Sequence, residues 1–192
     1  MNRSSRQKNG FTLVELVIAL TISILIFLIV VSAYDFNQRL YSDIDTRSEL
    51  VQNGRVIIDR LVREIRQAQK MVTNLPADTS DPDNLPDEIM FQDGHDISTI
   101  KYLRYYLDGS DLKRQIIAYY FTSDPDNYVY WDATDKDVPH GPPTMVILED
   151  RVVGEYVDDI EFWGNKLIHI NLYLYKNNRS ETINTSVYGR NL

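Results

Sequence analysis

The stretch Lys8–Leu16, reading Lys-Asn-Gly-Phe-Thr-Leu-Val-Glu-Leu, joins a short basic leader to a long apolar run. The run from Phe11 to Ala33 contains neither proline nor glycine, and it is long enough to cross a hydrocarbon core of about 30 Å as a helix. Glu15 is the one charged residue within that run. A carboxylate in a membrane helix costs about 2.5 to 3.5 kcal/mol when it is central and unpaired, so Glu15 needs a partner.

The distribution of charge predicts how the anchor is oriented. The chain carries −8 at pH 7, and the three basic residues of the leader (Arg3, Arg6 and Lys8) leave −11 for the remainder. A positive leader before a membrane helix favours a cytoplasmic leader and a head outside the cytoplasm. Because nucleic-acid binding depends on Lys and Arg that neutralise phosphates, we expect no nucleic-acid partner for so acidic a head.

The junction at Gly10 closely resembles the class III signal of type IV prepilins and pseudopilins. The resemblance implies that prepilin peptidase cuts after Gly10 and that the new amino terminus, Phe11, is methylated. It also implies that Glu15 pairs with the terminal amine of a neighbouring subunit during assembly on an inner-membrane platform. An ordinary secretory signal is cut after its apolar region, whereas this cut precedes it, so the mature chain keeps its anchor. The alternative is an ordinary, uncut signal anchor.

The residues after the anchor show a weaker resemblance to two groups within this class of proteins. These groups are minor pilins of the PilW kind and J-type minor pseudopilins of type II secretion. Three segments carry it: Arg55–Gln69, Tyr105–Arg114, and Thr185–Val187 with Arg190-Asn191. Major pilins commonly have a helix-breaking proline and a glycine in the anchor, where this chain has Ser32 and Ile24. The resemblance therefore favours a minor subunit over a bulk structural one.

After the membrane run, the sequence predicts that the helix continues to about Val72, with an apolar stripe along its second half. The stripe consists of Val51, Gly54, Ile58, Leu61, Ile65, Ala68 and Val72, widened by Ile57 and Val62. Burial against the chain's own sheet is the favoured interpretation, and a coiled coil with a partner is the alternative. Gly54 within the stripe predicts a close backbone approach. Asp59–Arg63 and Arg60–Glu64 are predicted as exposed pairs at helical spacing.

The remainder predicts an α+β fold of the pilin type, with a long helix packed on an antiparallel sheet. We expect a leader (1–10), a transmembrane helix (11–33), an amphipathic helix (34–73), an acidic loop (74–98) and a sheet head (99–192). The expected strands are Thr99–Leu107, Leu112–Thr122, Tyr128–Trp131, Thr144–Val153, Asp159–Trp163, Leu167–Tyr175 and Ser180–Tyr188. Asp108–Asp111 predicts a hairpin turn between the first two strands. Alternation within Leu167–Tyr175 predicts one buried face.

The sequence gives no indication of catalysis. It has no cysteine, and its three histidines, His95, His140 and His169, lie in no metal-binding or catalytic pattern. Asp-Pro-Asp-Asn occurs at Asp81–Asn84 and again at Asp124–Asn127, and loop carboxylates are calcium ligands. Solvated turns are the favoured interpretation of both. We therefore expect no cofactor, with calcium as the alternative, and no enzymatic activity.

Together these features predict a non-enzymatic minor pilin or pseudopilin that is anchored in the cytoplasmic membrane and incorporated into, or primes, a filament. The machine would be a type IV pilus, a type II secretion pseudopilus or a competence apparatus. An adhesin or DNA-uptake pilin on the same anchor is one alternative. A static single-pass envelope protein is another, and it would leave Gly10 uncut.

Overall fold

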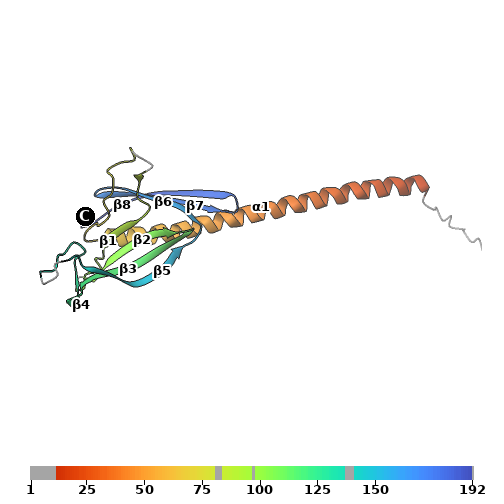
Figure 1. Cartoon of the computed structure of the whole chain (residues 1–192). Coiled ribbons are helices and arrows are strands. Elements are labelled where there is room, and N and C mark those ends of the chain that lie inside the picture. Colours follow the sequence, from red (N-terminus) through yellow and green to blue (C-terminus); the bar gives the residue numbers. More distant parts are fainter. Residues whose placement is uncertain (1–11, 81–83, 97, 137–140, 192) are drawn as a thin grey trace, which may run out of the picture. The chain divides into compact units, whose positions relative to one another are not determined.

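The computed structural model describes residues 12–80, 84–96, 98–136 and 141–191 (Figure 1). Helix α1 spans Leu13–Gln67. The chain divides into two compact units, residues 1–45 and residues 46–192. In the first unit, every described residue after Thr12 is helical, and all of them are exposed. The second unit, which we call the head, contains the end of α1 and all the strands.

The head has two antiparallel sheets, in place of the single sheet that we predicted. Its strands are β1 (Ile89–Gln92), β2 (Tyr102–Asp108), β3 (Asp111–Phe121), β4 (Asp124–Val129), β5 (Thr144–Gly154), β6 (Val157–Gly164), β7 (Leu167–Lys176) and β8 (Arg179–Tyr188). The first five form one sheet in the order β1-β2-β3-β4, with β5 also paired to β3, and the last three form a second sheet in the order β6-β7-β8. The α+β fold class is confirmed.

Local sequence accounts for the two clearest strand pairings. Asp108 pairs with Asp111 across the β2–β3 turn, where Gly109 has a φ of 64°, a conformation that glycine adopts without strain. In β7 the predicted apolar face is fully buried: Ile168, Ile170, Leu172 and Leu174. The predicted hairpin and the predicted face of β7 are both confirmed.

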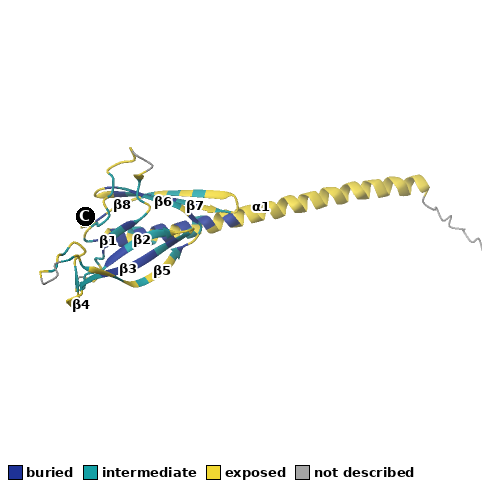
Figure 2. Cartoon of the chain, viewed as in Figure 1, coloured by how far each residue is buried: buried dark blue, intermediate teal, exposed yellow. Residues whose placement is uncertain are grey.

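The core lies where α1 meets both sheets, and burial along α1 is confined to its part in the head (Figure 2). The buried stripe of α1 consists of Thr46, Leu50, Gly54, Ile57, Ile58, Leu61, Glu64 and Ile65. A Cβ atom at Gly54 would collide with the side chains of Ile183 and Leu174, so the predicted close approach is confirmed. Val51 and Val62 are only partly buried, because Leu50 and Ile57 occupy the centre of the interface instead.

The helix ends at Gln67, and the prediction that it reaches Val72 is wrong. Beyond it, the backbone N–H of Gln69 donates to the carbonyl of Gln92 at 3.1 Å, and that of Val72 donates to Met90 at 2.9 Å. The predicted acidic loop 74–98 therefore contains a strand, β1, whose outer edge is paired by the chain that leaves the helix. Apolar spacing alone does not reveal that bonds to a distant strand replace helical ones.

Strand β4 also differs from its prediction, since it spans Asp124–Val129 rather than Tyr128–Trp131. The second Asp-Pro-Asp-Asn segment, predicted as a turn, is thus the first part of an exposed strand. Asn127 Nδ2 donates to Asp124 Oδ2 at 2.8 Å within it. The first such segment, Asp81–Asn84, lies outside the described residues except for Asn84.

Candidate functional site

Of the three predicted site residues, Gly10 and Phe11 lie outside the described residues, and Glu15 lies in the first turn of α1. The partner that Glu15 has in the structure is Thr12. Its Oε2 accepts hydrogen bonds from the Thr12 backbone N–H at 2.9 Å and from the Thr12 hydroxyl at 3.0 Å. The Glu15 N–H in turn contacts the Thr12 hydroxyl oxygen at 3.3 Å.

This reciprocal arrangement is a capping box, in which Thr12 is the N-cap and Glu15 the third helical residue. It satisfies two backbone donors that a helix start otherwise leaves open, and it places a negative charge at the positive end of the helix dipole. We did not predict this role. The pattern Thr-x-x-Glu immediately before an apolar run is its sequence signature, and it was present at Thr12–Glu15.

The helix that follows suits an apolar solvent. Its most apolar part has a mean hydropathy of 3.0 and is not buried within the protein. The helix is long and apolar enough to cross a membrane. Two of its hydroxyl groups are satisfied by the helix itself, since Thr21 donates to the Val17 carbonyl and Ser23 to the Ala19 carbonyl, each at 2.8 Å. Polar groups with internal partners avoid the cost of lying unsatisfied in hydrocarbon.

The head contains a second charged cluster, between α1 and the β2–β3 hairpin. Arg114 Nε donates to both oxygens of Glu64, at 3.1 and 3.0 Å, and the Tyr105 hydroxyl donates to Glu64 Oε2 at 2.5 Å. All three residues are buried. Arg60 Nε lies 3.7 Å from Glu64 Oε1, so the predicted Arg60–Glu64 pair exists, but the prediction that it is exposed is wrong for Glu64.

The electrostatics of this cluster follow from burial. Burial, followed by the negative charge of Glu64, raises the pKa of Tyr105 well above its ordinary value. Burial opposes the charged form of Arg114, yet its bonds to Glu64 outweigh that effect and raise the pKa of the guanidinium. The Arg114 Nη1 atom is buried without a hydrogen-bond partner in the described structure, 3.9 Å from Glu149 Oε1. Glu64 is therefore the nearer and more buried of the two carboxylates that compensate this cation.

Helical spacing could have revealed Glu64. Position 64 follows Ile57 by seven residues and Leu61 by three, and it precedes Ala68 by four, which places it on the apolar face. A carboxylate there requires a buried cation, which Arg114 supplies.

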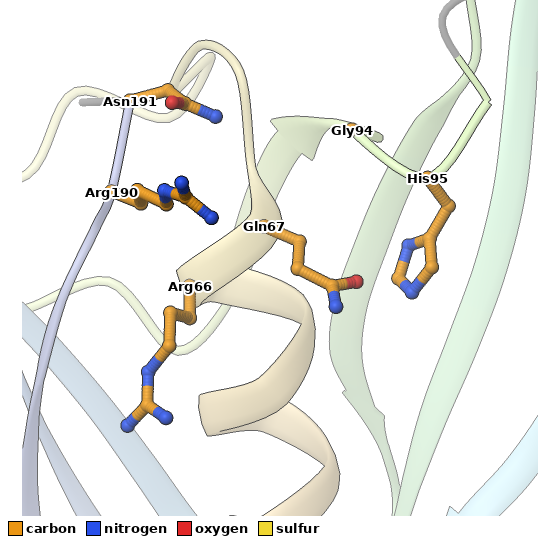
Figure 3. Close-up of a pocket in the computed structure, with 6 residues that line it drawn as sticks. All are labelled: Arg66, Gln67, Gly94, His95, Arg190 and Asn191. Atoms are coloured by element: carbon orange, nitrogen blue, oxygen red, sulfur yellow. The ribbon is translucent and has the colours of Figure 1, made fainter.

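An open pocket lies at the end of α1, beside the loop after β1 and the C-terminal segment (Figure 3). Its lining consists of Arg66, Gln67, Gly94, His95, Arg190 and Asn191. The backbone N–H of Arg190 donates to the Arg66 carbonyl at 3.3 Å, and a side chain at position 94 would collide with the Gln67 carbonyl. Among these six residues His95 is a potential base, but none carries a hydroxyl or thiol that it could activate.

The two histidines that the structure describes, His95 and His169, have different partners and do not contact each other. His95 Nδ1 lies 2.8 Å from Asp93 Oδ1, whereas the His169 ring stacks on Trp163 with centroids 5.2 Å apart. His140 lies outside the described residues. Within the described part of the chain, no group of three or more His, Asp or Glu side chains is placed to hold a metal ion.

Residues 5–33 match the family model described as the prokaryotic N-terminal methylation motif. The match includes all three predicted site residues and the apolar part of α1, and it supports the type IV prepilin and pseudopilin class. That class consists of structural subunits anchored by one membrane helix. No curated protein matches the chain in sequence.

Glu64→Gln should destabilise the head, because it leaves the buried Arg114 guanidinium with only the more distant, partly exposed Glu149 as a counter-charge. Breaking one side of a buried ion pair costs about 3 kcal/mol or more. Thermal melting of the full-length protein in detergent, followed by the circular dichroism of the sheets, should show a clear drop. Asp59→Asn on the exposed face of α1 is the matched control and should leave the melting temperature nearly unchanged. Equal melting of the two variants would contradict a compensating role for Glu64.

The head should also lose stability in alkali through Tyr105. Because the folded-state pKa of its phenol is raised above the unfolded value near 10, the folded state holds the proton more tightly. That stabilisation is complete below about pH 10 and is lost as the pH rises further. Tyr105→Phe should melt lower at pH 8 but decline less between about pH 9 and 11. Tyr188→Phe, at an exposed position, should follow the unaltered protein at every pH.

Proposed function

We propose that this chain is a minor pilin or pseudopilin, a non-enzymatic subunit that is cut after Gly10, methylated at Phe11 and built into a type IV filament-like assembly. The observation that supports this most strongly is the methylation-motif match at the head of an exposed apolar helix. The subunit would first lie in the cytoplasmic membrane with its head outside, and then enter or prime the filament. Its partners would be prepilin peptidase, other subunits and the assembly platform.

The form of the anchor helix supports a minor role. Positions 24 and 32 are both within α1, so the membrane segment has no breaker that would let it unwind during assembly. This continuity is consistent with a subunit that initiates or caps a filament. We assign the chain to the PilW-like or J-type group from the resemblance of its head segments alone. The assembly that it joins would be a motility pilus, a secretion pseudopilus or a competence apparatus.

Three other functions make different predictions. A DNA-uptake pilin needs cations together with aromatic surfaces on which bases stack. The pocket with Arg66 and Arg190 has the cations, but its lining contains no Phe, Tyr or Trp. An adhesin would share the anchor and its processing, whereas a static envelope protein would retain the leader. Processing therefore separates the proposal from the last alternative.

The mature chain should begin with N-methylated Phe11. A bulky residue in place of Gly10, as in Gly10→Leu, should leave the full-length precursor in the membrane, because the scissile position would no longer be small. Intact-mass spectrometry of the membrane fraction distinguishes the two forms. Gln7→Leu places the same leucine elsewhere in the leader and should be processed normally. A mature chain that begins at Met1, or beyond Ala19, would be incompatible with the proposal.

Glu15 should recruit the subunit by its charge, beyond its role in the cap. Glu15→Gln keeps an oxygen that can accept from the Thr12 N–H but cannot form an ion pair with a neighbour's amine. Thr12→Val removes the hydroxyl bond to Glu15 while keeping the charge. We expect Glu15→Gln to be cut normally but to be recovered poorly in sheared filaments, and Thr12→Val to be recovered well.

The comparison of these two variants tests the mechanism directly. Filament recovery is scored by quantitative mass spectrometry relative to the membrane fraction. If Thr12→Val is lost from filaments as strongly as Glu15→Gln, the helix cap rather than charge pairing governs entry. If both enter normally, apolar packing alone recruits the subunit.

A further inference from the structure

Helix α1 changes character where its apolar run ends. No residue between Glu15 and Asp35 is charged, and these two carboxylates are 20 positions apart. At 1.5 Å per residue this interval measures about 30 Å, which is the thickness of a hydrocarbon core. When Glu15 lies at one boundary of that core, Asp35 therefore lies at the other, where hydrocarbon gives way to lipid headgroups.

Aromatic residues gather at this second boundary. Phe27 is the one aromatic residue of α1 before position 34, whereas Tyr34, Phe36 and Tyr41 lie within a stretch of eight residues. These three residues, which we call the collar, are 62%, 63% and 74% exposed. Figure 2 shows this part of α1 as a helix that no other element of the chain covers. The collar thus continues the exposed surface of the apolar run.

The collar residues lie on opposite sides of the helix. Successive residues of an α-helix are rotated by about 100°, so Phe36 lies about 200° from Tyr34, while Tyr41 returns to within about 20° of Tyr34. A partner helix would contact one stripe of this surface, so it would cover either the two tyrosines or the phenylalanine. A lipid interface surrounds the helix and contacts all three side chains.

The heights of the collar residues fit the headgroup layer, which is about 5 to 7 Å deep on each side of the core. Along the helix axis, Tyr34 and Phe36 lie about 1.5 Å on either side of Asp35, and Tyr41 lies about 9 Å beyond it. Side chains of a helix lean towards its N-terminus, so the Tyr41 ring points back towards the membrane. All three rings therefore reach the zone in which amphipathic aromatic side chains are enriched.

The polar neighbours of the collar suit the same zone. Asn37 Nδ2 donates to the Ala33 carbonyl at 2.9 Å, and Gln38 Nε2 donates to the Tyr34 hydroxyl at 2.7 Å. Both side-chain amides thus have a partner within the helix at the depth where water becomes scarce. The Tyr34 hydroxyl accepts the bond from Gln38, so its own proton is available to a lipid phosphate or ester oxygen.

We propose that the collar binds the lipid headgroup layer at the end of the span that leads into the head, and that it fixes the depth of α1 in the membrane. The occupant is lipid because the collar is continuous with the apolar surface that crosses the membrane. The proposal rests on the membrane anchor of the proposed function, but neither on the cut at Gly10 nor on filament entry. It adds a step to that function, since the collar must leave the headgroups when the subunit leaves the membrane.

A single cysteine tests this depth without background, because the chain contains no cysteine. Ser32 lies about 4.5 Å on the hydrocarbon side of Asp35. The full-length protein with Ser32→Cys is reconstituted into phosphatidylcholine vesicles of short, medium or long acyl chains. The rate of reaction with a membrane-impermeant maleimide then reports how often the thiol meets water.

The collar should keep this thiol protected even in the thinnest bilayer, because the mismatch would be taken up at the other end of the span. Combined replacement of Tyr34, Phe36 and Tyr41 by alanine should make the thiol react several-fold faster there. Tyr34→Ala and Phe36→Ala should each accelerate the reaction when introduced alone, since the two residues lie on opposite sides of α1.

The matched control is Phe27→Ala, which removes an exposed aromatic side chain from the middle of the span and should leave the rate unchanged. The melting of the head, followed by circular dichroism, should be the same in every variant, because residues 27–41 lie outside it. Raising the lipid-to-protein ratio identifies the occupant. Protection by lipid persists on dilution, whereas protection by a second copy is lost by mass action.

The proposal is overturned if the combined alanine variant reacts as slowly as the parent in thin bilayers, or if Phe27→Ala has the same effect. It is also overturned if protection falls on dilution with lipid. The intact mass of the mature chain tests the cut at Gly10 separately, so a failure of the collar would leave the proposed processing in place.

Discussion

The head depends on one constraint, namely that the second half of α1 provides an apolar surface for two sheets at once. Each sheet has an apolar face that only another element can bury, and α1 serves both sheets. The helix meets the three-stranded sheet through Gly54, where the absence of a side chain admits Ile183 and Leu174. It meets the five-stranded sheet through Glu64, where a charge must be compensated. Leu61 and Ile65 lie fully buried in the core that both sheets share.

The Glu64–Arg114 pair specifies the packing more than it adds to stability. Removing two charges from water costs nearly as much as their attraction returns, so such a pair is a weak source of net stability. A shift of α1 by one turn would nevertheless move Glu64 away from Arg114, and breaking this buried pair would cost about 3 kcal/mol or more. The same shift would also break the hydrogen bond that the buried Tyr105 hydroxyl donates to Glu64. The pair thereby selects one register of the helix on the β2–β3 hairpin.

The features that the sequence predicted correctly are those with short-range causes. The anchor helix, the Asp108–Asp111 hairpin and the alternating face of β7 each follow from spacing within a few residues. The helix end at Gln67 and the strand β1 have long-range causes, since backbone bonds between residues 69–73 and 90–92 decide both. At the candidate site, the resemblance to a known motif identified Glu15 but predicted a partner in a neighbouring subunit. The Thr-x-x-Glu pattern could have predicted the local partner, Thr12.

The capping role of Glu15 changes the energetics of assembly. A carboxylate near the start of a membrane helix was expected to be costly until a neighbour's amine arrived. In the structure, two hydrogen bonds from Thr12 already offset part of that cost within a single chain. An ion pair with a neighbour's amine would therefore add only to the stabilisation that Thr12 already gives Glu15. The free energy gained on assembly would be smaller than the full cost of placing an unpaired carboxylate in the membrane. Under the proposed function, a smaller gain would make insertion into a filament more readily reversible. The same carboxylate would then stabilise the unassembled subunit through its own helix and favour its entry into a filament through its charge.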